Sequence, residues 1–286
     1  MRLLVFGETG QLARELARRC PGGVEAAFLG RPAADLAEPS NCAAAILNSN
    51  ADAVINAAAW TAVDLAEAEE AAATVANGAA PGAMAGACAA KGIPFLHVST
   101  DYVFDGAGDA PFAPGHGPAP LSAYGRSKLA GETAVRASGA RHVILRTSWV
   151  FSGTGNNFLK TMLRLGSERK SLRVVADQVG GPTPAAALAD ALHVAARAMA
   201  EGRAGGTYHY SGAPDVSWAD FARAIMSAAG LSCRIDDIRS SEYPTAARRP
   251  MNSRLDCSSF TRDFGLRRPD WRIAVEDILK EMGTTA

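Results

Sequence analysis

A tyrosine and a lysine stand four residues apart in the segment YGRSK, as Tyr124 and Lys128. On a helix this spacing puts both side chains on one face, about one turn apart. A tyrosine hydroxyl titrates near pH ~10, and a neighbouring ammonium lowers the tyrosine pKa toward the working pH. Such a tyrosine can donate a proton to a developing alkoxide, and Ser99 or Thr100 offers a second hydroxyl. The pair alone is also common on solvated helices, so its surroundings must support this interpretation.

The elements that position these residues follow from the first half of the sequence. Short apolar segments alternate there with helical patterns, which is typical of a parallel sheet covered by helices on both faces. Connections of this kind are nearly always right-handed, so the sequence predicts a doubly wound α/β (Rossmann) fold. We expect strands at residues 3–6, 26–29, 53–56, 93–98 and 143–146, with helices at about 11–19, 41–48, 67–91 and 124–137.

Two glycines, Gly7 and Gly10, directly follow the first strand and open the first helix. Glycines at such a turn let backbone amides approach a pyrophosphate, and the helix N-terminus favours the negative charge. The spacing G-x-x-G-x-x-A puts Ala13 at the packing position and is typical of short-chain dehydrogenases. Two glycines three apart can also form a mere tight turn, but their place between strand and helix favours nucleotide binding.

The second strand ends at Leu29-Gly30-Arg31 without an acidic residue. An acid at this point hydrogen-bonds the adenosine ribose, whereas an arginine accommodates a 2′-phosphate. This favours NADPH, with NADH possible, although Arg31 can equally be a solvated loop residue. Asp35, followed by Leu36, can instead approach the adenine or the ribose. After the third strand, small residues either let the chain pass beneath a flat ligand or serve packing alone, in the run containing Ala57, Ala59, Trp60 and Thr61.

Charge and composition narrow the classes of partner. The 286 residues carry equal numbers of acidic and basic side chains, so no basic face for nucleic acid or an anionic membrane is indicated. The five cysteines show no short pair spacing, which argues against a zinc site or a disulfide framework and for a reducing compartment. No apolar run is long enough for a signal peptide or a membrane span. We therefore expect a cytoplasmic protein that binds small molecules.

The second half of the sequence has a different rhythm. Helices are expected near residues 157–165, 184–200, 217–229 and 272–282, with a strand at 207–210. A Pro- and Arg-rich stretch at 243–250 interrupts any regular element. We interpret residues 1–150 as an NAD(P)-binding Rossmann domain. Residues 151–286 are then mainly a smaller C-terminal substrate-binding lobe over the carboxyl ends of the strands, with segments near 177–200 returning to the first domain.

Several sequence blocks together resemble a known family. They are GETGQLA at 7–13, NAAAWTAVDLAE at 56–67, STDYVFDG at 99–106, YGRSKLAGE at 124–132, RTSWVF at 146–151, GNNFLKTMLRL at 155–165, DQVGGPT at 177–183 and ARRPMNSRL at 247–255. The chain resembles the extended short-chain dehydrogenase/reductases and, among them, the dTDP-4-dehydrorhamnose reductase family. The resemblance spans nearly the whole sequence. It implies NAD(P)H-dependent reduction of the 4-keto group of dTDP-4-dehydro-β-L-rhamnose to dTDP-β-L-rhamnose, the last step in making that activated sugar.

The resemblance also implies roles for single residues. Tyr124 is the proton donor, Lys128 binds the nicotinamide ribose and lowers the tyrosine pKa, and Thr100 tunes the tyrosine and holds the substrate. The backbone at the pyrophosphate comes from Gln11, Leu12, Ala13 and Arg14, and Ala59, Trp60 and Thr61 line the cofactor. Further substrate contacts are expected at Asp101, Tyr102, Trp149, Asn156 and Arg249. Two of these stay open from the residues alone, because Asn156 or Asn157 can cap a helix and Arg249 can decorate a surface turn.

Other functions of the same fold remain alternatives. Dehydratases of this group place Asp-Glu after the threonine as acid and base, but this chain has Asp101-Tyr102. An epimerase would keep its cofactor tightly bound. A non-catalytic relative, a regulatory subunit of methionine adenosyltransferase, would not need the intact tyrosine, lysine and threonine.

Two further expectations concern assembly. Some relatives bind a divalent cation at a dimer interface through two glutamates. Glu15 is present, but Ala186 stands where the second would lie, so we predict that no metal is required. A homodimer formed through the first two helices is an expectation of the resemblance alone.

Overall fold

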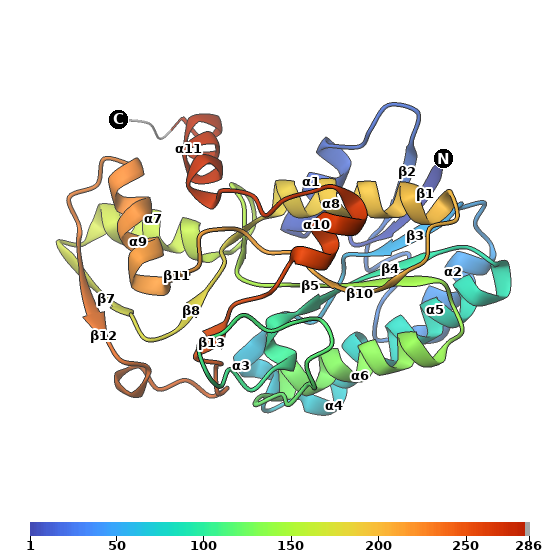
Figure 1. The fold of residues 1–286 in the computed structure, drawn as a ribbon, viewed down its shortest axis with the longest axis horizontal. Helices are drawn as coiled ribbons and strands as arrows, with labels where there is room; N and C mark the ends of the chain where they lie inside the picture. The colour runs from blue at the N-terminus through green and yellow to red at the C-terminus, as the bar shows by residue number, and fades with distance from the viewer. Residues whose placement is uncertain (284–286) are drawn as a thin grey trace.

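The computed structural model describes residues 1–283, and its centre is a six-stranded parallel sheet (Figure 1). The strand order is β10-β5-β4-β3-β1-β2. The central strands are almost continuously apolar because helices cover both faces of the sheet. The prediction of a doubly wound α/β fold is thus confirmed. The strands are β1 (Arg2–Phe6), β2 (Glu25–Leu29), β3 (Ala53–Asn56), β4 (Phe95–Thr100), β5 (His142–Thr147) and β10 (Gly206–His209).

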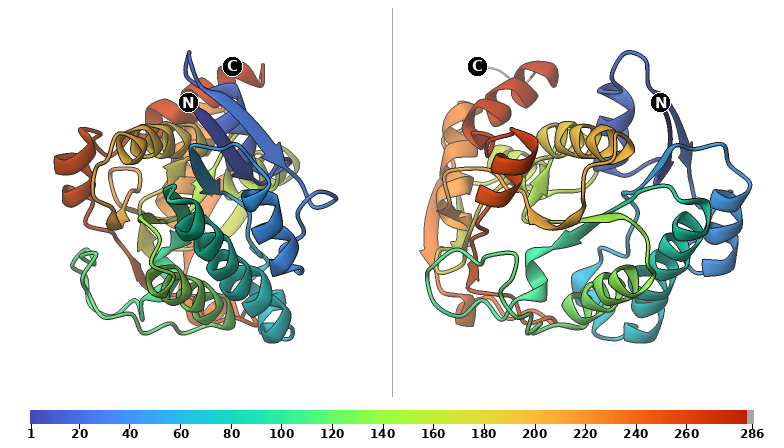
Figure 2. Two further views of the ribbon diagram at one scale, coloured as in Figure 1. Left: turned by 90° about the vertical axis from the view of Figure 1, so that its right-hand side faces the viewer. Right: turned by 45° about the vertical axis from the view of Figure 1, so that its right-hand side comes forward.

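Helices form a layer on each side of this sheet (Figure 2). On one face α1 (Gln11–Arg18) packs beside α8 (Ala185–Ala200), and Leu16 and Leu192 are buried in one core with the strands. On the other face α2 (Pro39–Leu47), α5 (Ala80–Lys91) and α6 (Ala123–Ala137) bury Ile46, Met84 and Val135 in a second core. Residues from both halves of the sequence therefore build the large sheet and its covering.

The single helix expected over residues 67–91 is interrupted. The structure has a short turn α3 (Val63–Ala66), helix α4 (Glu70–Thr74) and a π-helical turn η1 (Val75–Ala79) before α5. Pro81 lies in the first turn of α5 and has no backbone N–H to donate, so the regular ladder of hydrogen bonds cannot continue through it. The expected helix is therefore wrong in its start and in its continuity.

A smaller lobe lies at the left of Figure 1 and has its own apolar core. Its helices are α7 (Phe158–Glu168), α9 (Trp218–Ala228) and α11 (Trp271–Glu281), packed on a parallel pair of strands, β7 (Ser171–Val175) and β12 (Arg234–Ile238). The sequence analysis did not predict this strand pair or helix α10 (Ser258–Phe264). Short strands link the lobe to the sheet region: β6 (Val150–Phe151), β8 (Val179–Gly180), β9 (Thr183–Pro184), β11 (Val216–Ser217) and β13 (Asn252–Ser253).

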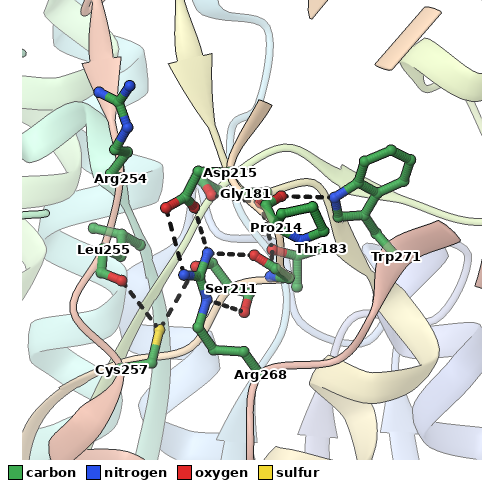
Figure 3. Close-up of polar contacts among 12 residues, drawn as sticks. Gly181, Thr183, Ser211, Pro214, Asp215, Arg254, Leu255, Cys257, Arg268 and Trp271 are labelled. Atoms are coloured by element: carbon green, nitrogen blue, oxygen red, sulfur yellow. Dashed lines mark hydrogen bonds and ion pairs between the residues drawn. The ribbon is translucent and has the colours of Figure 1, made fainter. Parts of the chain in front are cut away.

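Arg268 ties together the chain segments that meet where the lobe joins the large sheet (Figure 3). Its Nε donates to the Ser211 carbonyl at 3.2 Å, and its Nη2 donates to the Gly212 carbonyl and to the Asp215 carboxylate. Beside it, the indole Nε1 of Trp271 donates to the Pro214 carbonyl at 2.7 Å. These contacts fix the segment that follows β10 against the start of α11.

None of the helices within residues 1–283 combines the length and the apolar character needed to cross a bilayer.

Candidate active site

A cleft of about 1360 Å³ lies at the carboxyl ends of the sheet strands, between the sheet and the smaller lobe. It is lined by nearly all the residues that the sequence singled out. These are Gly7, Gly10, Gln11, Leu12, Arg31, Asp35, Leu36, Ala57, Ala59, Trp60, Thr61, Thr100, Asp101, Tyr102, Tyr124, Lys128, Trp149, Asn156 and Arg249.

Two expected cofactor contacts, Ala13 and Arg14, are not among the lining residues. Ala13 is buried beneath the glycine turn, where its Cβ lies 3.5 Å from the position a Cβ on Gly7 would take. Arg14 turns back and donates from Nε to the Thr9 carbonyl at 3.0 Å. Both residues therefore contact the glycine turn and do not line the cleft.

The turn itself is shaped for close approach. Gly7 has φ +113°, a conformation that L side chains rarely adopt, and a Cβ there would lie 3.4 Å from the backbone of Ala57 and Ala58. Gly10 caps the N-terminus of α1, so the first free N–H groups of the helix lie at the cleft. A backbone cradle at a helix N-terminus suits an anionic phosphate group.

Arg31 and Asp35 lie together at the far end of this cradle. The Arg31 side chain is 86% exposed, and its Nε is 4.0 Å from Asp35 Oδ2. A guanidinium held this loosely keeps donors available for a further anion.

The loop after β3 is held by a residue that the sequence analysis missed. Asn77, in the π-helical turn, accepts from the Trp60 backbone N–H at 2.8 Å and donates to the Trp60 carbonyl at 3.0 Å. Its amide also donates to Ser127 Oγ on α6 at 3.0 Å. Asn77 is 1% exposed, so its amide, and not water, satisfies the backbone polar groups of Trp60. Its contact with Ser127 connects the loop to the helix that carries Tyr124.

Tyr124 and Lys128 lie in the first turns of α6, whose N-terminus is capped by Ser122 accepting from the Gly125 N–H at 3.2 Å. Lys128 is 2% exposed, and its Nζ donates to the Val98 carbonyl at 2.8 Å. Burial lowers the pKa of Lys128 to about 8, against the opposing effect of Glu132.

Burial and then the Asp101 carboxylate raise the pKa of Tyr124, and the Thr100 hydroxyl acts in the opposite direction. The Lys128 amine contacts the β4 backbone at Val98, and that Lys128 lowers the tyrosine pKa stays a prediction. Tyr124 is therefore protonated at neutral pH, which is the form that a proton donor needs.

Two buried polar atoms at the cleft have no protein partner within residues 1–283. One is Oδ2 of Asp101, whose Oδ1 accepts from the Thr100 hydroxyl at 3.0 Å; burial raises the pKa of this carboxyl to about 6. The other is Oγ1 of Thr147, which lies opposite Thr100 in the β4–β5 register. Thr147 was also missed by the sequence analysis. Buried polar groups without partners are rare, so these atoms suit the polar groups of a ligand.

Aromatic rings form the wall of the cleft on the lobe side. The indoles of Trp149 and Trp218 stack with centroids 3.6 Å apart and 11° between their planes, and Phe158 lies 4.5 Å from Trp218. Trp149 has φ +48°, which is unusual for a bulky residue and indicates a locally constrained backbone. Asn157 accepts from the Lys160 N–H at 3.1 Å and caps α7, and both Asn156 and Asn157 line the cleft.

Arg249, a residue of the cleft lining, pairs with Asp64. Its Nη2 and Nη1 lie 2.8 and 3.1 Å from the two Asp64 oxygens, and the Ala247 N–H also donates to Asp64 at 3.0 Å. The pair joins α3 to the segment after η3 (Ser240–Glu242), and Arg249 lines the cleft.

Comparison with known proteins places these features in a family. The family model described as RmlD substrate binding domain matches residues 1–284. A dTDP-4-dehydrorhamnose reductase from Sinorhizobium fredii is 45% identical over 278 residues, which cover 95% of this chain and 94% of the relative. The chain belongs to the dTDP-4-dehydrorhamnose reductase family.

Solved structures of family members agree with the fold. A dTDP-4-dehydrorhamnose reductase from Clostridium acetobutylicum has a TM-score of 0.92 at 33% identity, covering 99% of this chain and 100% of the other. A reductase from Bacillus anthracis, solved in complex with NADP, has a TM-score of 0.91 at 33% identity, covering 98% and 99%. The resemblance stated from the sequence blocks is thus confirmed at the level of the family.

Tyr102 stands where the resemblance leads us to expect a glutamate in dehydratases. Its ring meets Tyr124 edge-on, with centroids 5.5 Å apart, and burial raises its pKa. A phenol that stays protonated cannot serve as the general base that water elimination requires.

Over residues 1–283, no three or more His, Cys, Asp or Glu side chains form a group that could hold a metal ion. Glu15 instead pairs with Arg18 at 2.8 Å. That no metal is required stays a prediction.

Proposed function

We propose that this chain reduces the 4-keto group of dTDP-4-dehydro-β-L-rhamnose with NADPH and forms dTDP-β-L-rhamnose, the last step in the synthesis of that activated sugar. One observation carries the proposal beyond family membership. The protonated Tyr124 lies at the same cleft as the glycine cradle, beside Thr100 and Lys128. A proton donor and a dinucleotide cradle sharing one cleft suit the reduction of a carbonyl.

The residues present fit the cofactor. Gly7 and the N-terminus of α1 suit its pyrophosphate, and the exposed Arg31 suits a 2′-phosphate. The complex of the Bacillus anthracis relative with NADP supports NADPH. When bound, NADPH supplies the hydride that reduces the carbonyl carbon.

The protein must then stabilise the negative charge that develops on the carbonyl oxygen. Tyr124 donates its proton to that oxygen, and the hydroxyl of Thr100 stabilises the oxygen by a hydrogen bond. The ammonium of Lys128 adds a positive charge on the same side of α6. The unpaired oxygen of Asp101 accepts a hydrogen bond from a sugar hydroxyl, and Trp149, Asn156 and Arg249 contact the rest of the dTDP-sugar.

The proposed domain organisation follows the same division. Residues 1–150 bind the cofactor, residues 151–286 mainly form the substrate lobe, and segments near 177–200 return to the Rossmann domain. We also infer a cytoplasmic enzyme that requires no divalent cation, and a homodimer through α1 and α2 as the form to test.

A coupled assay tests the reaction directly. dTDP-4-dehydro-6-deoxyglucose is supplied with a 3,5-epimerase, this protein and NADPH, and the product is identified. We expect stoichiometric NADPH consumption and dTDP-β-L-rhamnose. Absence of NADPH consumption, with binding to a methionine adenosyltransferase instead, would support a non-catalytic role.

Tyr124→Phe tests the proton donor in the same assay. We expect kcat to fall about 10²- to 10⁴-fold, the usual contribution of a positioned acid, while NADPH still binds. Tyr208→Phe is the matched control, because the Tyr208 hydroxyl bonds Asp263 away from the cleft. An unchanged kcat in Tyr124→Phe would remove the proposed mechanism.

A further inference from the structure

A fully buried histidine, His97 on β4, lies directly behind Lys128 and has no part in the mechanism above. Its Nε2 is 3.4 Å from Lys128 Nζ, and its Nδ1 is 3.2 Å from the amide nitrogen of Asn56 on β3. All three side chains are at most 2% exposed. With no water to compensate, the hydrogen bonds among them determine which atoms carry protons.

The amide of Asn56 has only one orientation that satisfies its neighbours. The backbone N–H of Ala58 donates to Asn56 Oδ1 at 3.1 Å, and a backbone N–H can only donate. Oδ1 therefore faces Ala58, and the NH₂ group faces His97. Since this NH₂ group also only donates, Nδ1 of His97 must be the acceptor.

The protonation of His97 follows from this contact. Burial, and then the charge of Lys128, lower the pKa of His97 well below its usual range, so the ring is neutral. A neutral imidazole carries one proton. Because Nδ1 accepts from Asn56, that proton is on Nε2, and it points toward Lys128.

An N–H that faces an ammonium has no acceptor there, because an ammonium has three donors and no lone pair. Lys128 already donates to the Val98 carbonyl at 2.8 Å. We propose that His97 is a positioning residue for Lys128. Its Nε2–H disfavours the charged ammonium, because neither group can accept a hydrogen bond from the other, but it can donate a hydrogen bond to the neutral amine. Lys128 therefore releases its proton readily. The inference rests on the proposed function only where it says that the reaction uses the Lys128 proton. The protonation of His97 is argued from the contacts alone.

The other charged groups around Lys128 do not supply this effect. On α6, Glu132 favours the ammonium, but its carboxylate is held by Arg146 from β5 at 2.8 and 2.7 Å and by Ser99 at 2.7 Å. Arg136 also donates to it at 2.6 Å. On the cleft side, Asp101 and Tyr124 act on each other. Burial lowers the pKa of Lys128 to about 8. The proposed orientation of His97 acts in the same direction.

The tautomer can be measured in the protein without cofactor. With ¹⁵N-labelled histidine, the chain offers only five imidazoles, and the His97→Gln variant identifies the signals of His97. We expect a neutral ring with the proton on Nε2 from pH 6 to 9. A proton on Nδ1, or a charged ring, would overturn the proposal. This measurement stands whether or not the protein reduces the proposed sugar.

The effect on Lys128 appears in the pH dependence of kcat/KM. In His97→Gln the side-chain carbonyl can accept from the ammonium, so Lys128 holds its proton more strongly. If the ammonium is needed, activity falls as pH rises through the pKa of Lys128. We expect this alkaline limb to move upward by about one pH unit, a tenfold change in proton affinity.

His193→Gln is the matched control, because His193 is also buried but bonds the Leu16 carbonyl far from the cleft. We expect its alkaline limb to stay at the wild-type pH. His97→Asn keeps an acceptor for Asn56 and removes the Nε2–H, so it should shift the alkaline limb in the same direction. It replaces the glutamine variant if that variant fails to fold. An unmoved limb in a folded His97 variant would contradict the proposed role.

Discussion

At the residue scale, burial shifts the pKa values of the ionisable groups at the cleft. Tyr124, Tyr102 and Asp101 all have a pKa raised by burial, and Lys128 has a pKa lowered by burial. Each shift favours the neutral form of its group. At neutral pH both tyrosines are therefore protonated, whereas Asp101, with a pKa of about 6, and Lys128, with a pKa of about 8, are mostly charged.

The carboxyl of Asp101 should link stability to pH. Its pKa of about 6 in the folded protein lies above its usual value of 3.8, so the folded state binds this proton more tightly than the unfolded state. The stabilisation is complete below pH 3.8 and is lost as pH rises through about 6. At pH 8 the difference amounts to about 3 kcal/mol.

Asp101→Asn tests this link because the amide cannot ionise. We expect urea unfolding to show the variant more stable than wild type at pH 8, with the advantage shrinking toward pH 4. Asp109→Asn, at an exposed position, should show no such trend. A difference that does not vary with pH would mean that the ionisation of Asp101 is not responsible.

At the element scale, two contacts between distant segments shape the cleft. The π-helical turn brings Asn77 to the loop after β3, and the α3 turn brings Asp64 to Arg249. Neither contact follows from the local pattern of its own segment.

Asn77→Ala should loosen the cofactor side of the cleft. The change leaves the part-buried N–H and carbonyl of Trp60 without their Asn77 partner. We expect a loss of about 2 to 3 kcal/mol in unfolding free energy and weaker NADPH binding. Asn41→Ala, at an exposed position on α2, is the comparison variant. Equal NADPH affinity in both variants would show that Asn77 does not order this loop.

Asp64→Asn should act on the substrate side. The pair with Arg249 is partly exposed, so its contribution is modest, and we expect KM for the dTDP-sugar to rise about two- to fivefold with little change in kcat. The increase should lessen at high salt, which screens the pair in wild type. Glu69→Gln is a neighbouring control. A drop in kcat without a change in KM would contradict a role in substrate binding.

At the scale of the whole molecule, the lobe and the sheet are held together by chain crossings and by the contacts of Arg268 (Figure 3). Both cores contain residues from widely separated parts of the sequence. The cleft exists because these two packed units meet.

Arg268→Met should weaken this junction. The variant leaves the Asp215 carboxylate and the carbonyls of Ser211 and Gly212 without their donor. We expect about 2 kcal/mol less unfolding free energy, with most of it recovered when Asp215→Asn is added, because the unpaired charge is then gone. Arg267→Met, at the exposed neighbouring position, should be close to wild type. Failure of the double variant to recover stability would assign the loss to the carbonyl contacts.

The sequence by itself determined the fold class and the family, and nearly all the site residues that it singled out line the cleft. The reason is that parallel strands end at one edge of the sheet, so motifs that follow strands, such as Gly7, Thr100 and Trp149, must meet there. Local signals also located most helices, but they did not reveal the π-helical turn or the β7–β12 pair.

Only the tertiary structure decided how these residues are arranged. Asn56 and His97 are 41 residues apart, Asp64 and Arg249 are 185 apart, and their contacts depend on how whole elements pack. Tyr124 and Lys128 lie in the first turns of one helix, as their spacing predicts, but the lysine amine donates to the Val98 carbonyl and burial raises the pKa of the tyrosine. Spacing along a helix determines which side chains are neighbours, whereas burial and distant partners determine their charge.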